Sequence, residues 1–165
     1  MMRTGSEADA GRIAELHIAS WRATYAAELS AEFLARQEVS EWADDWRESI
    51  IAGERLLLAE DGTALVGFVA CGPARGEFAE PGEWQIYNIH VAPDRHGEGI
   101  GSKLFDAAAA LGRNASATRL VLWVVETNHR ARIFYESKGM SWDGHRQDHA
   151  LESDVLHEVR YQRTL

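Results

Sequence analysis

The chain has 165 residues, of which 45% are hydrophobic and 26% charged, a composition typical of one globular domain over residues 1–165. The 17 Lys and Arg residues stand against 26 Asp and Glu residues, so the formal net charge is −9. Nucleic-acid binding, which needs clustered cations, is therefore not expected. Cys71 is the single cysteine, which excludes an internal disulfide and a thiolate-based zinc site, and we expect no metal.

No segment is typical of a membrane or secreted protein. The longest apolar run, Leu120–Val125, is far too short to span a bilayer. The first residues, Met1–Glu7, lack the apolar core of a signal peptide. We therefore expect a soluble cytoplasmic protein that makes no membrane contact.

Apolar spacing predicts three helices in the first third of the chain. The first covers residues 8–19 and places Ile13 and Leu16 among charged residues. Ser30 is a helix-capping residue and predicts the start of the second helix. The third helix covers residues 41–51.

The hydrophobic period then changes to that of strands. Residues 55–60 and 64–71 are separated by Asp61-Gly62, a pair that accepts the positive φ of a tight turn. These residues predict a β-hairpin. A further strand covers residues 83–91 after a glycine- and proline-rich loop.

The second half alternates helices with strands. The expected elements are a helix over residues 99–111, an apolar strand over 118–126, a short helix capped by Thr127 or Asn128, and two weaker strands over 144–150 and 156–164. Gly112 and Gly139 are predicted to end the two helices. Together the elements predict an α+β or mixed α/β domain around one sheet.

The most informative segment reads His-Gly-Glu-Gly-Ile-Gly-Ser-Lys over residues 96–103. Its three alternating glycines let backbone N–H groups turn toward one concavity before a helix, an arrangement that binds phosphate. The spacing differs from that of the dinucleotide fingerprint, whose third glycine would fall at Ser102. It also lacks the Gly-Lys-Ser/Thr of a Walker A loop. Taken alone, the glycines also fit a plain tight turn.

Two segments in the proper order resemble motifs of the GNAT superfamily, the GCN5-related N-acetyltransferases. Residues 96–101 resemble the pyrophosphate loop of motif A, Arg/Gln-x-x-Gly-x-Gly/Ala. The sequence Asn128-x-x-Ala131-x-x-Phe134-Tyr135 resembles motif B. The resemblance covers about residues 1–140 and implies a GNAT-like fold. That fold has a central, mostly antiparallel sheet with one splayed parallel strand pair, and helices on both faces.

The resemblance further implies acetyl-CoA as cosubstrate, held in a V-shaped splay between the strands at residues 83–91 and 118–126. The cofactor-binding residues that it implies are Ile89, His90 and Val91 at the strand edge, His96, Gly97, Glu98, Gly99, Ile100, Gly101, Ser102 and Lys103 at the pyrophosphate, and Asn128, Ala131 and Tyr135 in motif B. Tyr135 would protonate the departing thiolate.

Two positions depart from the family pattern. His96 stands where Arg or Gln is usual, so His96, Arg95 or Lys103 is expected to face the phosphates. Gln85 stands where many members carry a glutamate base. Strand alternation puts Glu83 on the same face as Gln85 and Tyr87, and we expect it to act as the base through a water that Gln85 and Tyr87 orient. A water relay to bulk solvent is the alternative.

Other residues have a functional and a structural interpretation. His90 and Cys71, both in strands, fit a structural histidine and an inert buried thiol better than a base and an acetyl carrier. Trp21 and Tyr25 resemble the region that shapes the acceptor pocket in many of these enzymes, although packing between helices explains them equally well.

The sequence thus predicts an acetyl-CoA-dependent N-acetyltransferase that acts directly on a primary amine of a small molecule, a peptide or a protein. Two alternatives remain: a noncatalytic acyl-CoA-binding or sensing domain, and an unrelated phosphate binder that uses the glycine loop alone. Tyr135 favours the enzyme, whereas Gln85 in place of glutamate mildly favours the sensor. A homodimer, common among similar proteins, is one expected form.

Overall fold

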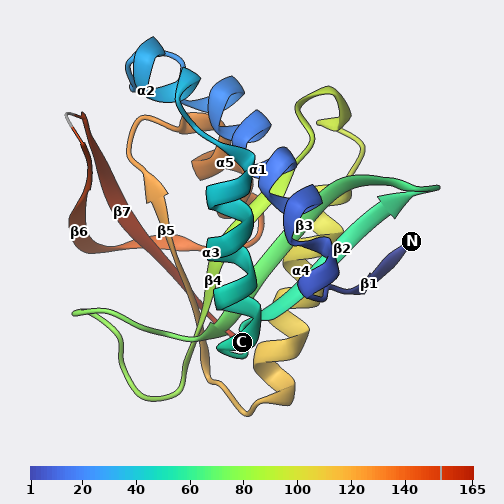
Figure 1. Cartoon of the computed structure of the whole chain (residues 1–165). Helices are drawn as coiled ribbons and strands as arrows, with labels where there is room; N and C mark the ends of the chain where they lie inside the picture. Colours follow the sequence, from blue (N-terminus) through green and yellow to red (C-terminus); the bar gives the residue numbers. More distant parts are fainter. Residues whose placement is uncertain (153) are drawn as a thin grey trace. The chain divides into compact units, whose positions relative to one another are not determined.

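The computed structural model describes residues 1–152 and 154–165. The elements in chain order are β1 (Met2–Thr4), η1 (Glu7–Asp9), α1 (Ala10–Thr24), α2 (Ala31–Ala35), α3 (Val39–Ile51), β2 (Arg55–Asp61), β3 (Ala64–Pro73), β4 (Glu83–Val91), η2 (Pro93–Arg95), α4 (Ile100–Asn114), β5 (Arg119–Val125), α5 (His129–Ser137), β6 (Ser141–Leu151) and β7 (Asp154–Thr164) (Figure 1).

Within the described residues, the strands form one sheet in the order β1-β2-β3-β4-β5-β7-β6. The pairs β1–β2, β2–β3, β5–β7 and β6–β7 are antiparallel, whereas β4–β5 is parallel. This arrangement confirms the predicted mixed fold with one parallel strand pair. No helix in the described part of the chain is both long and apolar enough to cross a bilayer.

The chain packs into two compact units, which are described in turn. The first unit contains Met1–Cys71 and Asn88–Ala108, and the second contains Gly72–Tyr87 and Ala109–Leu165. Strand β4 and helix α4 therefore each contribute residues to both units.

In the first unit, neighbouring residues of β3 point to opposite faces of the sheet. Phe68 is fully buried in a core with α1 and α3, and its ring centroid lies 5.2 Å from that of Trp46. A Cβ atom on Gly67 would lie 3.0 Å from Leu104 and 3.1 Å from Ile100, both in α4. Helices α1 and α3 thus cover one face of this part of the sheet, and the start of α4 covers the other.

Opposite charges fasten the N-terminal strand to the first unit. The Arg3 guanidinium donates to Asp9 at 2.6 and 2.9 Å and to Glu60 at 2.9 and 3.0 Å. Arg12 donates to the same Glu60 carboxylate at 3.0 Å. These hydrogen bonds lower the pKa of both carboxyl groups. The network ties β1 and α1 to the end of β2.

In the second unit, the parallel pairing of β4 and β5 is short. Glu83–Ile86 pair with Arg119–Leu122, and the next two residues along the strands, Tyr87 and Trp123, are not paired with each other. Strand β5 continues to pair with β7 through Val125. The parallel pair therefore opens at this point, as the predicted splay requires.

Several predicted boundaries were wrong. Gly112 does not end α4, which continues to Asn114; a Cβ atom at Gly112 would lie 2.8 Å from side-chain atoms of Trp84 and Leu165. The glycine therefore permits close packing. Strands β6 and β7 are longer than predicted, because most side chains of β6 are exposed or half-buried and give no clear apolar alternation.

Candidate active site

Left-handed backbone conformation shapes the loop before α4. Gly97 has φ +88° and Gly99 has φ +76°, and a Cβ atom at either position would meet nothing within 4 Å. Glycine is therefore needed there for its backbone conformation and not for space. The Lys103 N–H donates to the Gly99 carbonyl at 3.2 Å, so the helix begins directly after the second glycine.

The first turn of α4 offers unpaired backbone donors. The first N–H groups of a helix have no carbonyl partner within it, and here they belong to Ile100, Gly101 and Ser102. Gly101 lies inside the helix and does not have the positive φ of the two glycines before it. The helix dipole adds partial positive charge at this end, so the segment suits an anion.

The cations beside this loop have different surroundings. Arg95 donates to Glu98 at 2.8 and 2.9 Å and to Asp61 at 3.0 Å, which lowers the pKa of Glu98. The Nε2 atom of His96 lies 3.1 Å from the Val91 carbonyl oxygen. Lys103 is exposed and forms no ion pair with another described residue. Of the three expected phosphate contacts, Lys103 is thus the cation without a competing carboxylate.

The end of β4 turns one histidine toward α1. The Nδ1 atom of His90 lies 2.8 Å from the Ser20 hydroxyl oxygen, and its ring centroid is 4.3 Å from that of His17. Burial lowers the pKa of His90 to about 4. The His90 side chain therefore contacts α1.

His17 is buried among aromatic rings of α1, α3 and β3. Both of its ring nitrogens are buried, and neither has a hydrogen-bond partner in the described part of the chain. The surrounding ring centroids lie at 4.6 Å for Trp42, 5.6 Å for Trp46 and Phe68, and 6.0 Å for Trp21. Burial lowers the pKa of His17 well below its usual value, and the nearby His90 lowers it further.

Motif B forms the start of α5. The side-chain Oδ1 atom of Asn128 accepts the Ala131 N–H at 3.1 Å, which confirms the predicted helix cap. The amide NH2 group of Asn128 has no partner among the described residues. Tyr135 is buried on this helix with its ring centroid 5.4 Å from that of Phe134. Gly139, with φ +78°, follows the helix as predicted.

Glu83 occupies an ion-pair network and does not have the surroundings expected of a base. Its carboxylate accepts from Arg119 at 3.1 Å, from Arg160 at 3.3 Å and from the Glu80 N–H at 3.0 Å. Arg160 is also buried and donates to Asp143 at 2.6 Å. These contacts engage the carboxylate that the sequence predicts as the base.

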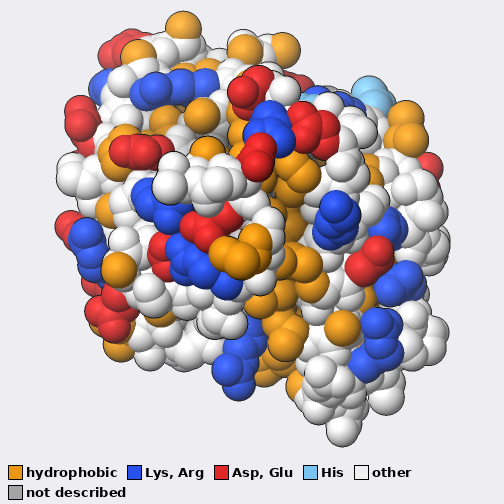
Figure 2. Space-filling view, turned by 90° about the vertical axis from the view of Figure 1, so that its right-hand side faces the viewer, with side chains coloured by type: hydrophobic (Ala, Val, Ile, Leu, Met, Phe, Trp, Pro, Cys, Tyr) orange, Lys and Arg blue, Asp and Glu red, His pale blue; other side chains and the backbone are white. Residues whose placement is uncertain are grey.

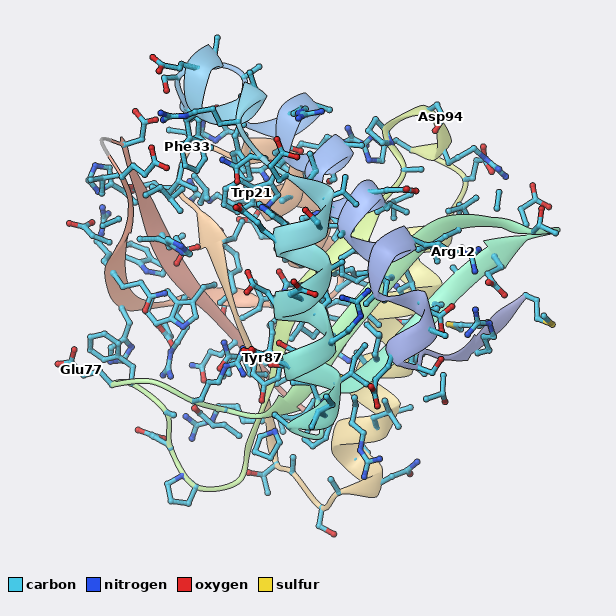
Figure 3. The ribbon with its side chains drawn as sticks, viewed as in Figure 1. Arg12, Trp21, Phe33, Glu77, Tyr87 and Asp94 are labelled. Atoms are coloured by element: carbon cyan, nitrogen blue, oxygen red, sulfur yellow. The ribbon has the colours of Figure 1, made fainter. Side chains whose placement is uncertain are left out.

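Gln85 and Tyr87 hold the segment that follows β3. The Oε1 atom of Gln85 accepts the Arg75 N–H at 3.1 Å, and the Tyr87 hydroxyl donates to the Pro73 carbonyl at 2.5 Å. The Arg75 guanidinium lies over the Tyr87 ring, 3.9 Å from its centroid. Figure 3 labels Tyr87 on its strand. The Gln85 oxygen that was expected to orient a water is thus used by the chain itself.

Sequence reasoning missed the charged residues of the closing hairpin. Arg160 and Asp143 are both buried, although neighbouring positions gave no sign of a charge pair. His145 adds a contact to Asp143 at 3.0 Å. The one available signal was an arginine between the apolar residues Val159 and Tyr161 of a strand. Within the described residues, no three His, Cys, Asp or Glu side chains are arranged to hold a metal ion.

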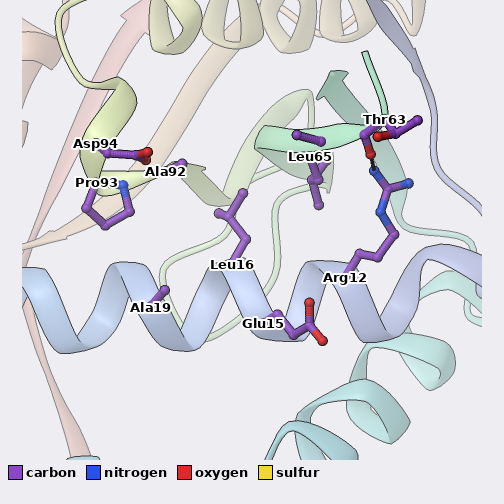
Figure 4. Close-up of a pocket in the computed structure, with 10 residues that line it drawn as sticks. Arg12, Glu15, Leu16, Ala19, Thr63, Leu65, Ala92, Pro93 and Asp94 are labelled. Carbon is purple, nitrogen blue, oxygen red and sulfur yellow. Dashed lines mark hydrogen bonds between the residues drawn. The ribbon is translucent and has the colours of Figure 1, made fainter. Parts of the chain in front are cut away.

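An open groove of about 440 Å³ lies in the first unit, between α1, the β2–β3 turn and the start of η2 (Figure 4). Leu16, Leu65 and Pro93 contribute apolar surface, whereas Arg12 and Glu15 contribute charge. The molecular face that carries this turn shows an apolar band between charged side chains (Figure 2). The groove does not include the glycine loop.

Comparison with known sequences identifies similar proteins. Residues 12–140 match the sequence model of the acetyltransferase (GNAT) family. The chain is 30% identical over 146 residues to a probable N-acetyltransferase of Mycobacterium tuberculosis, and the match covers 87% of this chain and 80% of that protein. It is 29% identical over 125 residues to an uncharacterized N-acetyltransferase of Bacillus subtilis, with 76% and 70% covered.

Solved structures share the fold at low sequence identity. A ribosomal-protein-alanine N-acetyltransferase from Brucella melitensis has a TM-score of 0.77 at 20% identity, covering 100% of this chain and 99% of that chain. The PaiA N-acetyltransferase from Thermoplasma acidophilum, in complex with coenzyme A, has a TM-score of 0.77 at 16% identity, with 100% and 98% covered.

The structural role of Glu83 is testable by its stability effect. Glu83→Gln should lower the free energy of unfolding by about 2–3 kcal/mol, because it removes the charge that faces two arginines in a buried site. Glu80→Gln is the matched control: it removes the exposed partner of Arg119 and should change stability by less than about 0.5 kcal/mol. Urea unfolding measures both. Equal stabilities for the two variants would contradict the assignment.

Low pH should lower the stability of the first unit because two of its histidines are buried. Because the pKa of His17 and that of His90 lie below 6.5 in the folded chain, the unfolded chain binds protons that the folded chain does not. Stability is therefore full above pH 6.5 and falls as the pH drops toward 4. His17→Leu should make this fall shallower, as measured by urea unfolding at pH 7, 6 and 5. Parallel pH profiles for variant and wild type would refute the effect.

Proposed function

The chain belongs to the GNAT acetyltransferase family, and we propose that it transfers the acetyl group of acetyl-CoA directly to a primary amine of a small molecule, a peptide or a protein. The observation that carries the proposal is the glycine loop at the N-terminus of α4. Its two left-handed glycines, its unpaired helix donors and the exposed Lys103 together suit a pyrophosphate.

Backbone groups of the loop would bind most of the CoA charge. The N–H groups from Glu98 to Ser102 would hold the pyrophosphate, and the Lys103 ammonium would add a charge-assisted contact. His96, next to the loop, would gain a second ring N–H donor on protonation. The complex of PaiA with coenzyme A supports a CoA site on this fold.

The remaining parts of CoA would contact backbone and amide groups. The edge of β4 at Ile89 and Val91 would offer strand N–H groups and the Ile89 C=O group to the amides of pantetheine, since the Val91 C=O group already contacts His96. Asn128 uses its oxygen for the α5 cap, so its NH2 group would be the donor to the pantetheine arm. Ala131 lies in the first turn of the same helix, where a small side chain admits close approach.

The chemistry requires placement and proton transfer. Holding the amine near the thioester carbonyl replaces an encounter between two free molecules. The amine must be neutral to attack, and for a lysine-like pKa of ~10.4 this costs about 4.6 kcal/mol at pH 7. As the C–N bond forms and the C–S bond breaks, the Tyr135 hydroxyl would give its proton to the departing thiolate.

A thiol-release assay tests the function directly. Purified protein, acetyl-CoA and a panel of small amines, amino acids and peptides should release CoA thiol with at least one acceptor. CoA binding without release against any amine would favour the noncatalytic acyl-CoA-binding alternative. Stabilisation by ATP or NAD equal to that by CoA would favour an unrelated phosphate site.

Backbone freedom at Gly99 should be needed for CoA binding. Gly99→Val should weaken CoA binding at least tenfold, since a β-branched residue disfavours the left-handed conformation and redirects the loop amides. Gly53→Val is the matched control, because Gly53 has φ +93° and equally open surroundings away from the loop. Isothermal titration measures both affinities. Unchanged affinity in a folded Gly99→Val variant would refute the loop's role.

If Tyr135 is the acid, loss of its hydroxyl should lower turnover without weakening CoA binding. Tyr135→Phe should lower kcat roughly a hundredfold and leave CoA affinity nearly unchanged, because only the proton donor is lost. Tyr161→Phe removes another buried hydroxyl, one that contacts Arg132 and Glu136, and should keep kcat. Steady-state kinetics decide: full activity of Tyr135→Phe would assign this residue to packing.

A further inference from the structure

Acetyl transfer to an amine leaves an extra proton on the nitrogen of that amine, and a base must take it. Neither Glu83 nor Gln85, the two residues expected to serve here, supplies that base. Glu83 is held by two arginines, and the Gln85 amide does not titrate. The first unit, however, contains a pair of imidazoles that the proposed function does not use: His90 at the end of β4 and His17 in α1. Their ring centroids are 4.3 Å apart.

The two imidazoles differ in how they reach solvent. Both nitrogens of His17 are buried without a partner, whereas His90 keeps part of its surface exposed. Its Nδ1 atom lies 2.8 Å from the Ser20 hydroxyl. Its Nε2 atom has no hydrogen-bond partner among the described residues and keeps some solvent-accessible surface. In the tautomer whose Nδ1 proton is directed at Ser20, Nε2 keeps a lone pair that solvent or a ligand can reach.

His90 also lies at the part of β4 that is proposed to hold CoA. It lies between Ile89 and Val91, whose backbone edge is proposed to hold the pantetheine arm. The same unit carries the glycine loop proposed for the pyrophosphate. A base on this residue would therefore be adjacent in the chain to the backbone that holds the thioester.

Aromatic rings surround the histidine pair on the α1 side. Trp21 packs edge-on against Tyr25 at 5.3 Å and against Trp42 at 5.4 Å, and all three rings are partly exposed. Figure 3 labels Trp21 on α1, near α3. Such ring faces attract an ammonium group without adding a carboxylate that would hold its proton. This surface therefore fits the approach of an amine toward His90.

We infer that His90 is the base that takes the proton from the acceptor amine through Nε2, with Ser20 and His17 as positioning residues. This inference rests on the proposed acetyl transfer. The neutral amine attacks the thioester carbon, the C–N bond forms, and its N–H proton moves to Nε2. The C–S bond breaks, the thiolate takes a proton from Tyr135, and the imidazolium returns its proton to solvent, from which Tyr135 is reprotonated.

The surroundings explain why the proton does not stay on His90. His17 of α1 is the titratable group that faces it, while Ser20 and Phe68, from α1 and β3, carry no charge. The rings of Trp42 and Trp46 from α3 pack on His17 and are also uncharged. Burial keeps the pKa of His90 low, so the imidazole is neutral and ready to accept a proton at pH 7. A weak base suffices because the nitrogen becomes far more acidic once it is bonded to the carbonyl carbon.

The test is chemical rescue of a histidine deletion. With an amine that the wild type acetylates, His90→Ala should lower kcat about a hundredfold at pH 7 and leave CoA affinity within twofold. Added imidazole should restore at least a tenth of the rate, because Nε2 opens to solvent. His149→Ala, which removes an exposed histidine of β6, should behave as wild type with and without imidazole.

A second test changes Ser20, which contacts His90, and keeps the imidazole ring of His90. Ser20→Ala should lower kcat about tenfold with KM and CoA affinity unchanged, and Ser20→Thr should restore the rate. The outcomes separate two failures. An active wild type with full activity in His90→Ala, or with loss that imidazole does not rescue, overturns the base assignment alone. A wild type that binds CoA but acetylates no amine overturns the proposed function and this inference with it.

Discussion

Left-handed backbone at Gly97 and Gly99 is the constraint on which the account of this protein depends. Two such residues in three positions turn the chain from the end of β4 into the first turn of α4, so that the helix donors follow the strand within a few residues. Any residue with a Cβ atom would strain this turn. The loop is further tied by Arg95, whose guanidinium bridges Glu98 within the loop and Asp61 at the end of β2. Exposed ion pairs of this kind add little stability, so the glycines determine the geometry.

The first unit brings together groups that acetyl transfer would need. The edge of β4, the glycine loop and the helix α1 with its aromatic rings all belong to it. His90 connects them, since it follows the strand edge and contacts α1 through Ser20. In the second unit, buried charges have a structural role. Arg160 joins Glu83 of β4 to Asp143 of β6 and holds the carboxylate that the sequence suggested as a base.

Features set by local sequence could be predicted well. The hairpin after residue 55, the cap by Asn128 and the strand at residues 83–91 depend on a few neighbouring residues, and the structure confirms each. The turn of the hairpin lies at Gly62-Thr63, one residue after the predicted Asp61-Gly62. The ion pairs of Glu83 could not be predicted, because its partners Arg119 and Arg160 are 36 and 77 residues away in the chain. Gly112 was misread for the same reason: the side chains that require a glycine there come from distant parts of the chain.

Amide chemical shifts measured by NMR while CoA is added to the uniformly labelled chain test the central claim most directly. If the loop amides hold the pyrophosphate, the largest shift changes fall on the N–H groups from Glu98 to Ser102, with a common affinity. Desulfo-CoA, which keeps the pyrophosphate, should reproduce them, whereas pantetheine, which lacks it, should not. Saturable CoA binding that leaves these amides unshifted would contradict the account.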